Sequence, residues 1–234
     1  MLEKNQPFDT VASAIQAIAN GEFVIVVDDT DRENEGDLII AAEKITTEKM
    51  AFLVKHSSGL VCVGMPAQRL QALDLPQMVT HNADPFRTAF TVSLDYKYGT
   101  TSGISAADRA LTLRKLADPS SQAKDFHRPG HIFPLRARRG GVLERPGHTE
   151  AAHDLAAMAG LQPVGVLCEI VNDDGSMARR PDLFKFASVH GLKIISIADM
   201  KAYRARDLNY ALPGLQCIPR QQSRLLDAAM VYSG

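Results

Sequence analysis

The chain has few cysteines and little sign of a secreted or metal-finger protein. It holds three in 234 residues, Cys62, Cys168 and Cys217, and none of them forms a Cys-x-x-Cys pair. Cys62 and Cys168 stand inside apolar, strand-like runs. We therefore predict buried, reduced thiols and neither a disulfide framework nor a cysteine zinc site.

Long apolar runs and an excess of charge of one sign are also missing. No stretch approaches the roughly 20 apolar residues that cross a bilayer, and segment 1–6 has no apolar core of signal-peptide length. The formal charge of −1 gives no overall field to attract nucleic acid or anionic lipid, although residues 128–145 are locally basic. We expect a cytoplasmic protein with no nucleic-acid partner and no membrane partner.

What the chain does have is an alternation of helix-type and strand-type segments. This succession predicts an α/β (α+β) fold, a three-layer sandwich in which helices cover both faces of a mixed, twisted sheet. Helices are predicted over residues 11–18, 46–56, 105–116, 149–158 and 181–191, and strands over 23–27, 38–42, 60–63, 90–94, 132–137, 164–171 and 193–197.

One stretch lacks such periodicity. Residues 119–131 are polar and predict a mobile loop. We expect a single catalytic domain over residues 1–205, followed by a C-terminal tail over residues 206–234 to which we assign no role.

The most informative feature is the run 28–37, which packs six carboxylates and Arg32 between two apolar segments. The carboxylates repel one another and resist desolvation, so the run needs a counter-ion or a ligand. Alternate residues of an extended segment project to one side, which would direct Glu33, Glu35 and Asp37 into one space. Hard carboxylate oxygens favour Mg²⁺ or Mn²⁺. The alternative is a solvated surface turn, because Asp, Asn and Gly form turns.

A second motif, Arg-Pro-Gly-His-Thr-Glu at residues 145–150, stands at a predicted helix start. Backbone N–H groups there can bind an anion, and Arg145 can hold a phosphate through two parallel hydrogen bonds. His148 would stand beside that anion and suits a metal shared with a carboxylate. A capping turn with an incidental histidine is the alternative.

Two weaker signals complete the set. Residues 100–105 lead into a helix with hydroxyls and a glycine, which indicates either a second phosphate contact or ordinary N-capping. Glu169 interrupts the apolar strand 164–171. It is either satisfied by a buried partner or is an acid or base with a raised pKa.

The motifs at residues 31–37, 128–131, 133–137, 145–150 and 165–169 together resemble 3,4-dihydroxy-2-butanone 4-phosphate synthase of riboflavin biosynthesis, from about residue 10 to residue 205. The resemblance implies a homodimeric, magnesium-dependent lyase. Such an enzyme converts the sugar phosphate D-ribulose 5-phosphate to 3,4-dihydroxy-2-butanone 4-phosphate and formate through a metal-stabilised enediolate.

The resemblance also implies roles for individual residues. Glu33 and His148 are the expected metal ligands, for Mg²⁺ or Mn²⁺. His131 and Glu169 are expected to be needed for turnover. Glu35, which the acidic run itself singles out, is also expected to be catalytic. The expected substrate contacts are Arg32, Glu33, Asp37, Arg145, Pro146, Gly147, His148, Thr149 and Glu169.

Some members of that family continue into a GTP cyclohydrolase II domain with a cysteine zinc site. Because residues 206–234 hold one cysteine, we expect the monofunctional form. Two alternatives stay open: another metal-dependent sugar-phosphate isomerase or aldolase, and a non-catalytic nucleotide- or RNA-binding module of related fold. Formate release separates the synthase from both.

Overall fold

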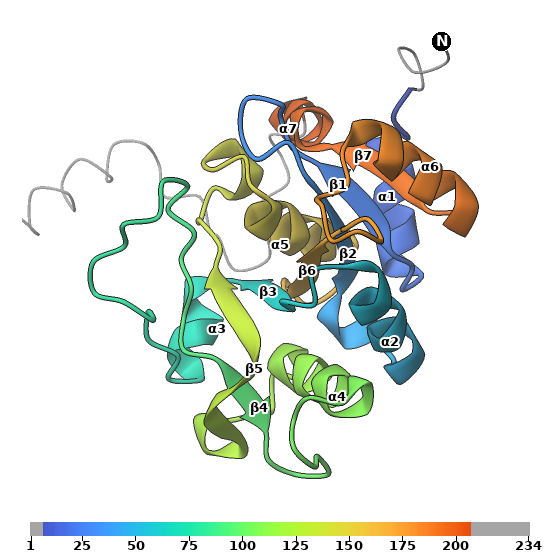
Figure 1. Ribbon diagram of the computed structural model, residues 1–234. Helices are drawn as coiled ribbons and strands as arrows, with labels where there is room; N and C mark the ends of the chain where they lie inside the picture. The colour runs from blue at the N-terminus through green and yellow to red at the C-terminus, as the bar shows by residue number, and fades with distance from the viewer. Residues whose placement is uncertain (1–6, 207–234) are drawn as a thin grey trace, which may run out of the picture.

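The computed structural model describes residues 7–206, and these form one mixed sheet with helices against it. Figure 1 shows the sheet running from β7 at the top of the view to β4 at the bottom, and within the described part its order is β4-β5-β3-β6-β2-β1-β7. The strands are β1 (Val24–Val27), β2 (Gly36–Ala41), β3 (Cys62–Met65), β4 (Leu94–Tyr96), β5 (Phe126–Arg136), β6 (Gly165–Glu169) and β7 (Lys193–Ser196).

The sheet mixes antiparallel and parallel pairings. β2 runs antiparallel to both β1 and β6, whereas β1 pairs with β7 and β3 with β5 in parallel. The helices are α1 (Val11–Ala19), α2 (Thr47–His56), α3 (Ala67–Ala72), α4 (Ala106–Ala117), α5 (His148–Met158), α6 (Arg180–His190) and α7 (Ile197–Arg206).

Both faces of the sheet are covered, which confirms the predicted three-layer arrangement. Ile25 and Val27 belong to a core that also holds buried residues of α2, α4 and α6. Their neighbours Val24 and Val26 belong to a second core, with buried residues of α1, α5 and α7. Successive strand side chains point to opposite faces, so apolar runs such as Val24–Val27 fill two cores at once.

The predicted mobile loop over residues 119–131 is wrong. A short 3-10 helix spans Ala123–Asp125, and β5 already begins at Phe126. The first part of β5 is mostly exposed, so its sequence carries no apolar alternation. Pairing with β4 supplies its backbone partners, and such tertiary context overrides local pattern.

Other predicted elements are present with shifted ends. The strand predicted over residues 90–94 is observed as β4, Leu94–Tyr96, while α3 and α7 were not predicted. No helix of residues 7–206 has the length and apolar character needed to span a bilayer. The expected tail lies outside the described residues apart from Arg206, the last residue of α7, and the domain boundary at residue 205 stays a prediction.

Candidate active site

Two carboxylates face each other where β2 and β6 meet. Asp37 of β2 lies directly opposite Glu169, the last residue of β6. Asp37 has the same side-chain direction as Ile39, which packs in the core shared with α5. His148, the first residue of α5, is also buried, and its Nδ1 lies 3.6 Å from Asp37 Oδ1. The sheet and the start of α5 thus enclose a polar cluster.

The acidic run forms a turn folded around Asp28, whose side chain is fully buried. Asp28 Oδ2 accepts hydrogen bonds from Arg32 Nη1 at 2.9 Å and from the Glu33 backbone N–H at 3.0 Å, and Oδ1 accepts from the Glu35 N–H at 2.8 Å. Asn34 closes the turn with a φ of 53°. The expectation of an extended segment is therefore wrong, because hydrogen bonds to one carboxylate bend the chain.

The turn nevertheless brings the predicted acids together. Glu33 Oε2 lies 3.5 Å from His148 Nδ1 and also pairs with Arg32. Glu35 lies near Glu33 and Glu169, and Arg179 of the α6 N-terminus approaches it at 3.9 Å. Arg32, Glu33, Glu35, Asp37, His148 and Glu169 thus form one cluster, to which the structure adds Asp28. In the sequence, Asp28 could have been found as the first acidic residue after a buried strand.

Burial and like charge shift the pKa values of this cluster. Burial, with the nearby Glu169, Glu33 and Glu35, raises the pKa of Asp37 to about 8. Burial lowers the pKa of His148, but the carboxylates of Asp37, Glu33 and Asp28 outweigh it and raise the value to about 9.

The pKa values of two further carboxyl groups shift in opposite directions. Burial opposes ionisation of Glu33, yet hydrogen bonds and charge from His148 and Arg32 hold its pKa below the ordinary value. Burial and the neighbouring Glu33 and Glu169 raise the pKa of Glu35. One site therefore holds carboxyl groups that bind protons with different strengths.

The cluster fits a divalent cation. Asp28, Glu33 and His148 each offer one ligand atom, all within 4.8 Å of one another. Asp37 Oδ1 and His148 Nε2 are buried without a hydrogen-bond partner among the described residues, and such orphaned atoms are costly. Carboxylate oxygens with one imidazole suit Mg²⁺ or Mn²⁺, and a cation would offset the repulsion. The oxygens of Asp28 already accept three hydrogen bonds, so Glu33 and His148 are the better candidate ligands.

The start of α5 has features of an anion site. Its N-cap is Gly147, so the helix begins at His148, one residue before the predicted start, and no side chain caps the first turn. A Cβ on Gly147 would lie 2.3 Å from Arg145 Nη1 and 3.0 Å from Arg32 Nη2, so both guanidinium groups lie beside the helix start. Pro146 precedes this turn, and Thr149 is buried within it. Uncapped N–H groups beside two arginines attract anions.

The guanidinium group of Arg145 already has protein partners. Nη1 donates to Glu150 Oε2 at 2.7 Å, and Nε and Nη2 donate to the Phe86 carbonyl at 3.1 and 3.0 Å. Nη2 also reaches Thr88 Oγ1 at 3.2 Å. Arg145 is thus a brace between α5 and the segment 86–88, and its phosphate contact stays a prediction.

His131 belongs to a second cluster. Its Nδ1 lies 2.6 Å from Asp95 Oδ2, and its backbone N–H donates to Asp95 Oδ1 at 2.9 Å. A Cβ on Gly103 would lie 2.1 Å from Asp95 Oδ2, so the loop 100–105 packs against this pair. Sequence reasoning gave Asp95 no role.

Glu169 has a hydroxyl partner. Ser58 Oγ donates to Glu169 Oε2 at 2.7 Å, and among the described residues no cation lies within ion-pair distance of this carboxylate. The side chain is partly exposed. The partner Ser58 is itself exposed, and a role of Glu169 as acid or base stays a prediction.

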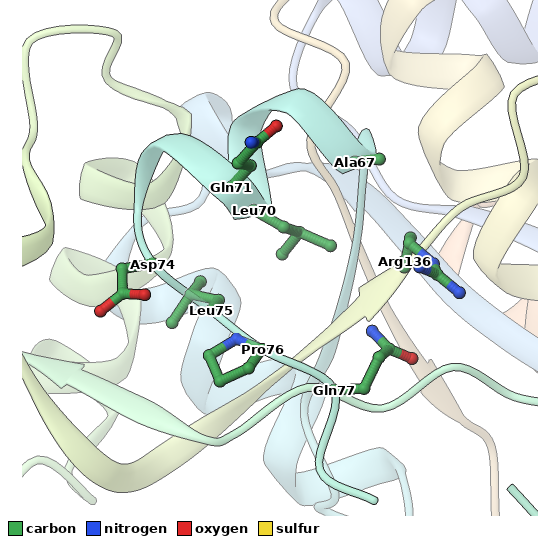
Figure 2. Close-up of a pocket in the computed structure, with 8 residues that line it drawn as sticks. All are labelled: Ala67, Leu70, Gln71, Asp74, Leu75, Pro76, Gln77 and Arg136. Carbon is green, nitrogen blue, oxygen red and sulfur yellow. The ribbon is translucent and has the colours of Figure 1, made fainter. Parts of the chain in front are cut away.

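A separate cavity of about 380 Å³ lies between α3 and β5 and includes none of the predicted site residues. In Figure 2 the polar groups of Gln77 and Arg136 lie near each other on one side of it, away from Asp74. Its lining consists of Ala67, Leu70, Gln71, Asp74, Leu75, Pro76, Gln77 and Arg136.

Known proteins resemble this chain over most of its length. Residues 12–203 match the family model described as 3,4-dihydroxy-2-butanone 4-phosphate synthase. A protein of that name from Agrobacterium fabrum (strain C58 / ATCC 33970) is 58% identical over 193 residues, covering 82% of this chain and 91% of that protein. A solved structure of such a synthase in complex with two magnesium ions is 53% identical with a TM-score of 0.83, covering 86% of this chain and 98% of the other.

Some relatives are longer. The chain is 59% identical to "Monofunctional riboflavin biosynthesis protein RIBA 2, chloroplastic" of Arabidopsis thaliana and 57% identical to "Riboflavin biosynthesis protein RibBA" of Aquifex aeolicus (strain VF5), each match covering 85% of this chain. It spans 42% of the first and 50% of the second.

Proposed function

The chain belongs to the 3,4-dihydroxy-2-butanone 4-phosphate synthase family, and from that premise we propose that it converts D-ribulose 5-phosphate to 3,4-dihydroxy-2-butanone 4-phosphate and formate in riboflavin biosynthesis. The observation that carries the proposal is the buried group of Glu33, Asp37 and His148 beside the uncapped start of α5. It offers a cation site next to an anion site, which a sugar phosphate needs.

In this proposal Glu33 and His148 hold the cation, Mg²⁺ by preference or Mn²⁺. When bound, the cation would stabilise the negative charge that develops on the sugar oxygens as a carbon-bound proton leaves. The relative solved with two magnesium ions supports magnesium as the cation, and the buried, unpartnered Nε2 of His148 supports a ligand role for this residue.

The chain's own residues supply binding and proton transfer. The N–H groups at the start of α5, with Pro146, Gly147 and Thr149, receive the phosphate, and Arg32 and Arg145 add positive charge. The pKa of Asp37, raised to about 8, lets this carboxyl group carry a proton near neutral pH, and burial with neighbouring carboxylates also raises the pKa of Glu35 above its ordinary value. Glu169, at the end of the neighbouring strand β6, serves as a further proton-transferring group.

The second cluster has its own proposed role. Asp95 fixes the ring of His131, whose side chain is 42% exposed and free to meet a substrate.

We also infer that the protein is cytoplasmic and forms a homodimer. Support for the dimer comes from exposed apolar side chains, which a partner subunit would cover: Leu60, Met78, Val79, Phe86, Tyr98 and Ile104.

The test is to incubate the purified protein with D-ribulose 5-phosphate and Mg²⁺ and to measure formate. We expect formate in step with consumption of the sugar phosphate, and its loss with excess chelator. Consumption without formate would favour an isomerase or aldolase, and binding without consumption would favour a binding module. The Glu33→Gln variant tests the proposed cation ligand. Glu22→Gln is its matched control, because Glu22 is an acid outside the cluster.

A further inference from the structure

We propose that Ser58 is a positioning residue that holds the carboxylate of Glu169 in its working direction, an inference that rests on the proposed proton-transfer role of Glu169. Ser58 lies in the loop between α2 and β3. Its hydroxyl is 2.7 Å from Glu169 Oε2. Among residues 7–206, no other side chain is seen to donate a hydrogen bond to that carboxylate.

The proton of the Ser58 hydroxyl has one best acceptor. Ser58 Oγ also lies 3.4 Å from Cys168 Sγ and accepts from the Leu60 N–H at 3.3 Å. The Cys168 thiol has an acceptor of its own in the Leu60 carbonyl at 3.3 Å. A hydroxyl carries a single proton, and a carboxylate is a stronger acceptor than a thiol, so this proton is directed at Glu169.

The loop that carries Ser58 is itself fixed. The Ser58 N–H donates to the Glu169 carbonyl at 2.8 Å, so the two residues are joined through backbone as well as side chain. The Gly59 N–H donates to Ser57 Oγ at 3.3 Å. Arg109 of α4, only 6% exposed, reaches the Gly59 carbonyl at 3.5 Å. A hydroxyl on such a frame can hold a side-chain rotamer.

Glu169 needs such a partner because its other neighbours are acidic. It lies opposite Asp37, and its charge contributes to the raised pKa values of Asp37 and Glu35. Without an opposing donor, repulsion would turn the carboxylate away from the cluster. A proton-transferring group must stay within hydrogen-bond reach of its substrate, so loss of Ser58 should slow turnover more than it weakens binding.

The experiment is a double-mutant cycle of Ser58→Ala and Glu169→Gln, assayed by formate release. Ser58→Ala alone should lower kcat about tenfold with KM changed less than about twofold, and Ser58→Thr, which keeps the hydroxyl, should restore most of kcat. In the Glu169→Gln background, Ser58→Ala should change kcat by less than about twofold, because no proton-transferring carboxylate is left to direct.

Ser120→Ala is the matched control. Its hydroxyl donates to Asp118 Oδ1 at 2.6 Å in an exposed turn, so it removes the same kind of bond outside the site. A normal kcat for Ser58→Ala, or an equal loss in both backgrounds, would overturn the inference. So would a kcat loss that Ser58→Thr fails to restore, accompanied by a lower Tm than that of Ser120→Ala. A fully active Glu169→Gln protein would instead remove the proposed role of Glu169 itself.

Discussion

Asp28 should hold the acidic turn together, and replacing it should cost stability as well as activity. Its side chain is fully buried and accepts one charge-assisted bond from Arg32 and two from backbone N–H groups. Asp28→Ala leaves those donors without this acceptor and leaves Arg32 with Glu33 as its remaining carboxylate partner. Removing one member of a buried ion pair costs about 3–5 kcal/mol, a large share of the roughly 5–15 kcal/mol that stabilises a domain.

Asp28→Asn gives an intermediate test. The amide oxygen can still accept from one backbone N–H, but its NH₂ group would point a donor at another donor. We expect a loss of about 1–3 kcal/mol, the cost of a buried donor left unsatisfied.

The assay is urea unfolding with chelator present, so that cation binding does not enter the free energy. Asp31→Asn in the same turn is the control, because Asp31 is exposed and its expected effect is within about 0.5 kcal/mol. If Asp28→Ala unfolds at the same urea midpoint as Asp31→Asn, with the same slope, the turn does not depend on this carboxylate.

Three further predictions concern cation, phosphate and thiol. Chelation should abolish formate release and Mg²⁺ should restore it. The Glu33→Gln and His148→Ala variants should lose this restoration by Mg²⁺. Full activity in excess chelator would exclude a cation role. Arg145→Ala should raise KM about ten- to a hundredfold, because a bidentate contact contributes about 1.5–3 kcal/mol; a lowered Tm with unchanged KM would leave Arg145 as the brace to segment 86–88. Burial raises the pKa of the Cys168 thiol to about 11, so at pH 8 only about one thiol in a thousand is ionised. In a Cys217→Ser background, iodoacetamide should therefore label the folded protein far more slowly than the urea-unfolded protein. Equal labelling rates would contradict a buried thiol.

The sequence by itself determined the layers of this fold. Apolar runs such as Val24–Val27 can be buried on both faces only inside a covered sheet, and helices with Thr10, Thr46 and Ser105 as caps begin where the pattern predicts. Carboxylate crowding and a helix start are local properties, so the sequence also singled out the acidic run and the segment of His148, while the pairing of Glu33 with His148 as metal ligands came from the resemblance to the synthase family.

Tertiary structure alone decided which groups meet. Asp28 became the centre of the acidic turn through hydrogen bonds that its neighbours make only when the turn is folded, and β5 extends to Phe126 because β4 pairs with it. Ser58 reaches Glu169 from 111 positions earlier in the chain. Side-chain direction and long-range pairing depend on how distant segments pack, and no local pattern of residues encodes those distances.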